Sequence, residues 1–157
     1  MNKLTVGGIL EVKDLTMIEI LGIPNLPGSA GQYLTLLGDA GINLHFIAEL
    51  EDKHGYANIA ICLHHRHADQ ALEIINNTIS KPESVIIKSR PHVGLLTVYG
   101  PHFREKPAIS SRLCFALGTN NINILGISSS VSSVCCVVTS QDYSKAYASL
   151  LTVFSLP

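Results

Sequence analysis

The chain has 157 residues and a formal net charge of −1, with 46% hydrophobic and 15% charged residues. These side chains suffice for one compact unit or two small ones. Eleven basic and twelve acidic residues form no basic cluster, which argues against nucleic acid binding through phosphate neutralisation. No apolar run approaches the roughly 18 residues of a membrane span, and the N-terminus lacks the apolar core of a secretory signal. We therefore predict a cytoplasmic protein that binds neither nucleic acid nor a membrane.

A strand-like segment at residues 4–12 opens the chain, and a complete α+β module follows it. In that module, β-branched apolar runs predict strands, and apolar residues at i, i+3, i+4 and i+7 predict helices. We expect strands at 17–24, 42–50, 56–63 and 84–88, a helix that starts at Ala30 with Ser29 as its cap and ends at Gly38, and a helix at 68–79. The order βαββαβ predicts a sandwich with both helices on one face of an antiparallel sheet.

The second half of the chain repeats this module. Residues 27–47 align with residues 107–127 without a gap, since 107 − 27 and 127 − 47 are both 80. Each copy has a proline at the predicted helix start, a glycine at its end (Gly38, Gly118), and then Ile-Asn followed by an apolar residue. A duplication of this size predicts two small domains of one fold, with the function at a junction between the copies.

The second copy is one strand short. Its expected strands are 93–99, 122–128 and 133–139, its expected helices are 107–118 and 141–153, and its fourth strand would fall beyond Pro157. An unfinished sheet leaves an open edge, and the strand-like residues 4–12 have no other place. We predict that they supply the missing strand. The first domain would then be residues 15–90, inserted in a second domain made of residues 1–14 and 91–157.

Several stretches resemble a known family over essentially the whole chain: IEILGIPNLPGSAGQYLTLLGDAGINLHFIAE, SSSVSSVCCVV and the N-terminal strand. They are similar to the tandem ACT domains at the C-terminal regulatory end of aspartokinases. The most specific parts are the Leu-Pro-Gly turn, the Gly-Ile-Asn step into a strand, and the Ser-Val-Cys-Cys-Val-Val strand. The resemblance implies two ferredoxin-like βαββαβ ACT domains, the second split by the first. The kinase domain is absent, so a free-standing regulatory unit, a separately encoded subunit and a fragment all stay open.

The resemblance also implies a function in amino-acid biosynthesis. ACT pairs bind a free amino acid at the interface between domains and signal its presence allosterically to an enzyme; in aspartokinases the effector is lysine or threonine. Open sheet edges and the apolar composition predict a homodimer, and a catalytic kinase chain is a further partner. No serine has a partnered base at readable spacing, and no Gly-rich phosphate loop follows a strand. We expect a regulatory protein without a cofactor and not an enzyme.

The resemblance places the ligand on a loop and on the strand that follows the first helix. The residues that it carries over are Asn25, Leu26, Gly28, Ser29, Ala30, Asn43, Leu44 and His45. Gly28 lets the backbone approach a ligand, and unpaired N–H groups of Ser29, Ala30 and Gly31 can hold an α-carboxylate. The amide oxygen of Asn43 can accept from an α-ammonium group.

Two departures from the family pattern bear on the ligand. Family members often carry an acid at the positions of Asn25 and His45, so Glu49 and Glu51 are the nearby acids here, and a lysine side chain is less well matched. In the second copy, Ala108 replaces the glycine after proline, which favours a structural role for that loop.

Other patterns support competing interpretations. A protein that binds no ligand and only holds a catalytic chain together is the main alternative. His64, His65 and His67 are a second, because three imidazoles can bind zinc or copper, but neighbouring histidines point in different directions and no fourth ligand is evident. We favour a solvated turn there and expect no metal. The four cysteines lack CxxC spacing and are predicted to be small apolar residues.

Overall fold

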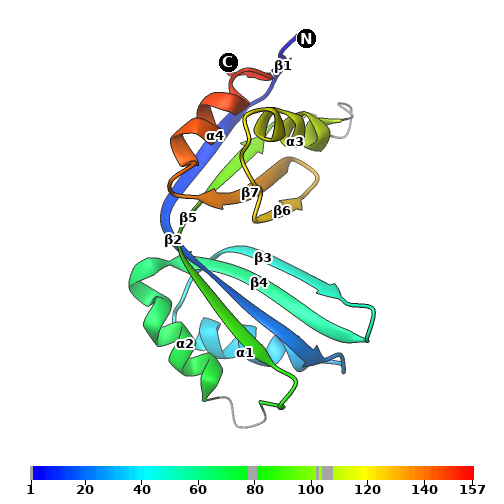
Figure 1. Ribbon diagram of the computed structural model, residues 1–157, viewed down its shortest axis with the longest axis vertical. Helices are drawn as coiled ribbons and strands as arrows, with labels where there is room; N and C mark the ends of the chain where they lie inside the picture. The colour runs from blue at the N-terminus through cyan, green and yellow to red at the C-terminus, as the bar shows by residue number, and fades with distance from the viewer. Residues whose placement is uncertain (1, 78–80, 102, 104–107) are drawn as a thin grey trace. The chain divides into compact units, whose positions relative to one another are not determined.

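The computed structural model describes residues 2–77, 81–101, 103 and 108–157 (Figure 1). Contacts divide the chain into two compact units, Leu15–Pro91 and Met1–Asp14 with His92–Pro157. We call them the continuous unit and the split unit. Both boundaries fall inside long strands, β2 (Gly8–Pro24) and β5 (Ile86–Tyr99). At these points Asp14 and His92 take left-handed backbone conformations, with φ of 60° and 59°.

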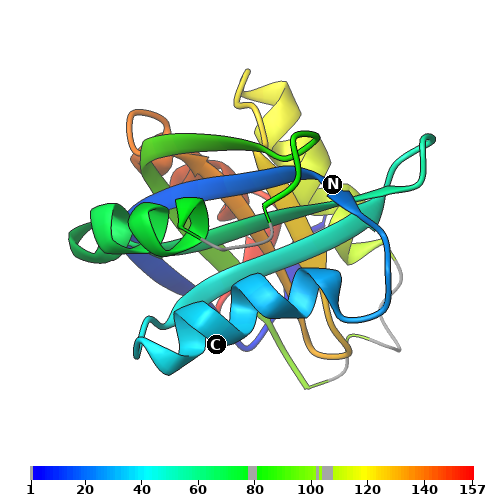
Figure 2. The same cartoon turned by 90° about the horizontal axis from the view of Figure 1, so that it is seen from below.

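The continuous unit contains the second part of β2, the first part of β5 and the elements between them. These elements are α1 (Ser29–Asp39), β3 (Leu44–Glu51), β4 (Tyr56–His64), the 3-10 turn η1 (His65–His67) and α2 (Ala68–Asn76). Its strands lie in the order β3-β4-β2-β5, and β4 is antiparallel to both of its neighbours. Both helices cover one face of the sheet (Figure 1 and Figure 2). Leu37 of α1 and Ile75 of α2 are fully buried there against Ile20, Ile59 and Ile61.

The split unit combines segments from both ends of the chain. Its elements are β1 (Leu4–Thr5), the first part of β2, the second part of β5, α3 (Ile109–Thr119), β6 (Gly126–Ser129), β7 (Ser133–Thr139), α4 (Tyr143–Leu150) and β8 (Phe154–Ser155). The strand order is β2-β5-β7-β6, with β7 antiparallel to β5 and β6. The helices contribute Leu117 and Leu150, and the strands Leu96, Cys136 and Val138, to one buried core.

The two ends of the chain meet in a short parallel ladder. Leu4 pairs with Phe154 and Thr5 with Ser155. The N–H of Leu4 donates to the carbonyl of Val153 at 2.9 Å, and the two hydroxyl groups of Thr5 and Ser155 lie 3.0 Å apart. Phe154 is fully buried, so this ladder closes the core of the split unit.

The predicted strand boundaries need three corrections. Residues 4–12 are not one strand: β1 ends at Thr5, and β2 runs from Gly8 through the predicted strand 17–24. Likewise the predicted strands 84–88 and 93–99 form the single strand β5. The polar residues between the two predicted strands of each pair indicate a loop by pattern, but the strand is continuous through them. The predicted strand 122–128 starts only at Gly126, and α4 ends at Leu150, before β8.

The remaining predicted elements agree with the structure in type. Pro107 and Ile79, predicted as helix ends, lie outside the described residues. The repeat extends to special backbone angles: Gly28 and Ala108, equivalent in the alignment, both precede a helix with φ of 84° and 70°. Gly41 and Asn121 are also equivalent, with φ of 74° and 58°. The two copies therefore build the same turns before and after their first helix.

Candidate functional site

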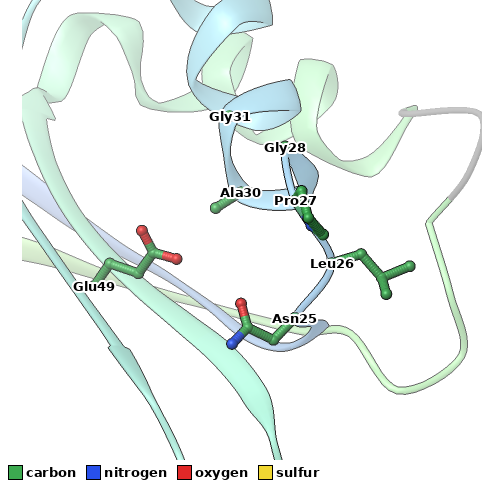
Figure 3. A pocket seen from close by; sticks show the side chains of 7 residues that line it. All are labelled: Asn25, Leu26, Pro27, Gly28, Ala30, Gly31 and Glu49. Atoms are coloured by element: carbon green, nitrogen blue, oxygen red, sulfur yellow. The ribbon is translucent and has the colours of Figure 1, made fainter.

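A pocket of about 410 Å³ opens in the continuous unit, where β2 ends and α1 begins. The residues that line it are Asn25, Leu26, Pro27, Gly28, Ala30, Gly31 and Glu49 (Figure 3). Six of the seven belong to one loop and the first turn of α1, and Glu49 comes from β3. Two segments that are separate in the sequence thus form opposite walls of one pocket.

The loop reaches the helix through a tight turn. The N–H of Leu26 donates to the carbonyl of Pro24 at 2.9 Å, and that of Ser29 donates to the carbonyl of Leu26 at 3.0 Å. Gly28 precedes the helix in a left-handed conformation, which glycine adopts without steric cost. The prediction that Ser29 caps the helix is wrong, because Gly28 is the N-cap residue and no side chain makes a capping bond.

The start of α1 offers two backbone donors to the pocket. Since the N–H of Ser29 is already bonded to Leu26, the expected set of three donors is reduced to Ala30 and Gly31. The N–H groups of Ala30 and Gly31 donate no hydrogen bond to another backbone group within the part of the chain that the structure describes. A side chain placed at Gly28 or Gly31 would meet nothing within 4 Å, so the helix start faces open space. Free N–H groups and the helix dipole favour an anion at this position.

A carboxylate from β3 and an amide from the loop both face the start of α1. Figure 3 shows the side chains of Glu49 and Asn25 pointing into the space in front of Ala30, whereas Leu26 points away from it. Glu49 is exposed and lies on β3 in register with Ile59 of β4. A carboxylate and an amide oxygen are suitable acceptors for an ammonium group. The chemistry of the helix start therefore favours an anion, and that of Glu49 and Asn25 favours a cation.

The structure brings together half of the sequence-predicted site residues. Asn25, Leu26, Gly28 and Ala30 line the pocket, whereas Ser29, Asn43, Leu44 and His45 are not among its lining residues. In β3, Leu44 pairs with Leu63 and Phe46 with Cys62, so His45 is the extra residue of a β-bulge. Pattern reasoning located Glu49 only as a nearby acid and Gly31 only as a donor, and it passed over Pro27 as a lining residue.

A second β-bulge lies in β2, just before the loop that lines the pocket. Ile20 pairs with Ile59 and Ile23 with Ala57, so β2 contains one extra residue near Gly22. The φ of Gly22 is 75°, and a Cβ there would collide with the carbonyl oxygen of Ser84. Only glycine fits this position. Its N–H donates to Oδ1 of Asn58 at 3.0 Å, and its carbonyl accepts from the Ser84 hydroxyl at 2.8 Å.

The turn between β3 and β4 is closed by Asp52. Its Oδ1 accepts from the N–H groups of His54 and Tyr56 at 2.8 and 3.1 Å, and its Oδ2 accepts from Nδ2 of Asn58 at 3.2 Å. The hydrogen bond from Asn58, followed by those from the Tyr56 and His54 backbone, lowers the pKa of Asp52. Asn58 therefore contacts both this turn and the bulge of β2.

The histidine run forms the turn η1 rather than a chelating group. Nδ1 of His64 accepts from the N–H of Arg66 at 3.1 Å, Arg66 Nε donates to Nε2 of His67 at 3.2 Å, and His65 Nδ1 lies 3.1 Å from the Thr16 hydroxyl. Within residues 2–77, 81–101, 103 and 108–157, no three His, Cys, Asp or Glu side chains group so as to hold a metal ion.

Two adjacent cysteines of β7 are poor nucleophiles. Burial raises the pKa of Cys135, and burial together with the neighbouring Cys135 and Cys114 raises the pKa of Cys136 to about 12. Both thiols stay protonated at neutral pH, and a thiol is far less reactive than a thiolate.

Among the described helices, none has the length and apolar character required to cross a bilayer.

Comparisons with known proteins match this chain to the ACT domain and to aspartokinases in sequence, and to solved structures in fold. Residues 96–154 match the family model of the ACT domain. The aspartate kinase of Pseudomonas fluorescens (strain SBW25) is 25% identical over 156 residues, which are 99% of this chain and 38% of that protein. The chain thus spans about two fifths of the length of the curated relatives that it matches.

Solved structures show the same fold. The ligand-free regulatory subunit of aspartate kinase from Thermus thermophilus superposes with a TM-score of 0.85 at 20% identity, over 96% of this chain and 99% of that one. E. coli aspartokinase III in complex with lysine and aspartate gives a TM-score of 0.71 at 12% identity, over 98% of this chain and 34% of that one. The predicted α+β fold and the resemblance to the regulatory part of aspartokinases are confirmed.

Proposed function

We propose that this chain, which carries an ACT domain at residues 96–154 and the fold of aspartokinase regulatory subunits, binds a free α-amino acid in the pocket of its continuous unit and acts as an allosteric regulator of a kinase. One observation carries the proposal: backbone donors of α1 and the carboxylate of Glu49 stand on opposite walls of one pocket. An α-amino acid zwitterion has a carboxylate and an ammonium group attached to one carbon atom, and these groups are complementary to the two walls.

The binding mode follows from the two walls. The α-carboxylate accepts hydrogen bonds from the N–H groups of Ala30 and Gly31, where the helix dipole adds to the attraction. The α-ammonium group donates to Glu49 and to the amide oxygen of Asn25. A volume of about 410 Å³ lies near the lower end of the range of about 300–1,000 Å³ for small-molecule sites. A single metabolite suits this volume better than a peptide.

The lining residues bear on which amino acid binds. Lysine and threonine are the effectors that the family resemblance implies, and one solved structure with this fold is a complex with lysine. Glu49 is the one acid among the residues that line the pocket. It can neutralise a single ammonium group, so a lysine side chain would leave its own ammonium without a partner there. We therefore place threonine ahead of lysine.

The assembly that we propose has three features. The chain forms two ACT domains, residues 15–90 and residues 1–14 plus 91–157, and it pairs as a homodimer in the cytoplasm together with a catalytic kinase chain. Open sheet edges support the dimer, because β3 ends its sheet and exposes Ile47 and Leu50 by 47% and 77%. The Thermus regulatory subunit with the same fold supports the kinase partner.

Single amino acids screened by thermal shift test the proposal. One or two should raise the Tm, because a ligand at a hundred times its Kd adds about 2.7 kcal/mol to the free energy of unfolding. Glu49→Gln should weaken that binding about tenfold or more, since it removes the charge that faces the ammonium group. Glu51→Gln is the matched control, because Glu51 is an exposed acid of the same strand and does not line the pocket. A flat screen together with co-purification of a kinase chain would instead favour the ligand-free structural subunit.

A further inference from the structure

The loop that carries Asn25 leaves the sheet directly after the bulge in β2. Between the pairs Ile20–Ile59 and Ile23–Ala57, β2 has one residue more than β4, and Gly22 takes its left-handed conformation there. A bulge bends its strand and changes the direction in which the chain continues. The direction of the pocket loop therefore depends on how the bulge at Gly22 is held.

Asn58 of β4 holds this bulge and a second structure at the same time. Its Oδ1 accepts the N–H of Gly22 at 3.0 Å, and its Nδ2 donates to Oδ2 of Asp52 at 3.2 Å. The same Nδ2 lies 3.5 Å from the carbonyl of Leu50, at the limit of a hydrogen bond. One half-buried amide side chain thus joins the bulge of β2 to the end of β3.

These two contacts lead to the two walls of the pocket. Asn58 stands in register with Leu50, which is the neighbour of Glu49 on β3. On its other side it bonds to Gly22, three residues before Asn25. Asn58 therefore links a segment next to Asn25 with a segment next to Glu49, although it is not among the residues that line the pocket.

We propose that Asn58 is a positioning residue of the pocket, which fixes the Asn25 wall relative to the Glu49 wall. Its effect on ligand affinity rests on the proposed function, whereas its effect on the geometry of the empty pocket does not. Ser84 bonds the carbonyl of Gly22 from another segment, so the bulge keeps one support when Asn58 is changed. Loss of Asn58 should consequently loosen the pocket without unfolding the unit.

Two variants of Asn58 and one control separate positioning from plain stabilisation. Asn58→Ala removes the hydrogen bonds to Gly22 and Asp52 together with the longer contacts to the carbonyls of Leu50 and Tyr56. Asn58→Asp keeps an acceptor for Gly22 but sets a second carboxylate beside Asp52, so it breaks only the link to the turn. Asn76→Ala is the matched control, because Asn76 is an exposed amide of α2 that bonds Leu72 and Lys81 and does not line the pocket.

The first measurement uses the full chain without ligand. In amide hydrogen exchange, the protection of the Gly22 N–H should fall about tenfold in Asn58→Ala and stay near the original value in Asn58→Asp, since an unmade bond to a partly buried donor has roughly this effect. In NMR spectra, the amide signals of Asn25 and Glu49 should shift in both variants and stay in place in Asn76→Ala. Unchanged signals at Asn25 and Glu49 in a folded Asn58→Ala protein would overturn the proposal, and if that variant is unfolded, Asn58→Asp decides by the same signals.

The second measurement uses the amino acid that the thermal screen identifies. Its Kd should rise about tenfold in Asn58→Ala and remain the same in Asn76→Ala. This difference should hold even if both variants lower the Tm by the same amount. A fall in Tm at unchanged Kd would mean that Asn58 is merely structural. If the original chain binds no amino acid, the proposed function fails, and the exchange and NMR data still decide whether Asn58 positions the walls.

Discussion

The starts of α1 and α3 show the same backbone with different surroundings. Gly28 and Ala108 are both left-handed N-cap residues, although alanine carries a steric cost in this conformation. In front of Gly28 the space is open, whereas in the second copy the Ser111 hydroxyl bonds the carbonyl of Ala108 at 2.9 Å. The left-handed turn is present in both copies with either residue, so it belongs to the duplicated scaffold.

The two copies also differ in one side chain of the strand opposite the helix start. Glu49 of β3 pairs with Ile59, and its equivalent on β6, Ser129, pairs with the equivalent residue Val134. The second copy therefore has a neutral hydroxyl where the first has a carboxylate. The comparison indicates that the duplicated scaffold kept its turns in both copies and that, at this strand position, the first copy has a charged group and the second does not.

The largest expected effect tests whether the two cores contribute equally to the free energy of unfolding. Leu37 of α1 and Leu117 of α3 are equivalent in the repeat and both fully buried. Changing either to Ala should lower the free energy of unfolding by about 2–5 kcal/mol, since each leaves a cavity in a close-packed core. Urea unfolding measures both. A loss below about 1 kcal/mol in only one variant would show that the cores are not equivalent.

An exchange of residues at the helix starts should have a smaller and reciprocal effect. Gly28→Ala should destabilise by about 1 kcal/mol, because φ there is 84°, and Ala108→Gly should stabilise by a similar amount at φ of 70°. Urea midpoints of the two variants give both numbers. Effects of the same sign would contradict the view that the turns are interchangeable.

The smallest effect concerns the two hairpin turns. The β3–β4 turn is held by the Asp52 carboxylate, whereas the β6–β7 turn is held by Ser130 and Ser133, whose hydroxyl groups lie 2.8 Å apart. The pKa of Asp52 is lowered on folding, so its contribution is present above the ordinary aspartate pKa and is lost as the pH falls through the folded value. Acid should therefore disorder the first turn before the second, which NMR titration of His54 and Ser132 amides can follow. Asp52→Asn should remove the difference.

The fold was predictable from local patterns, but its strand boundaries were not. Periodicity identified α1, which buries one helical face, and a β-branched apolar run identified β7. The continuity of β2 through Lys13 and Asp14 was missed, because polar residues within a strand resemble a loop when their ladder partners are unknown. Ser29 was predicted as the helix cap because serine is a common N-cap residue, but the left-handed Gly28 takes the N-cap position.

The site was predictable where it lies on one segment. Asn25, Gly28 and Ala30, which the family resemblance implied as binding residues, all line the pocket because they lie on one loop and the helix start that follows it. His45 was misplaced, because one extra residue in β3 changes the face to which a side chain points, and the sequence does not show register. The link from Gly22 through Asn58 joins strands that are distant along the chain, so only the folded structure reveals it.

The parallel ladder of β1 and β8 has a consequence for synthesis on the ribosome. The continuous unit is complete once its last strand has emerged, but Leu4 and Thr5 of β1 lack their partners until Phe154 and Ser155 have been synthesised. At about 5–20 residues per second this delay is on the order of ten seconds. During that time β1 has no strand with which to pair. Nascent chains arrested before Phe154 should therefore hold a folded insert and an N-terminal tail that proteases can still cut.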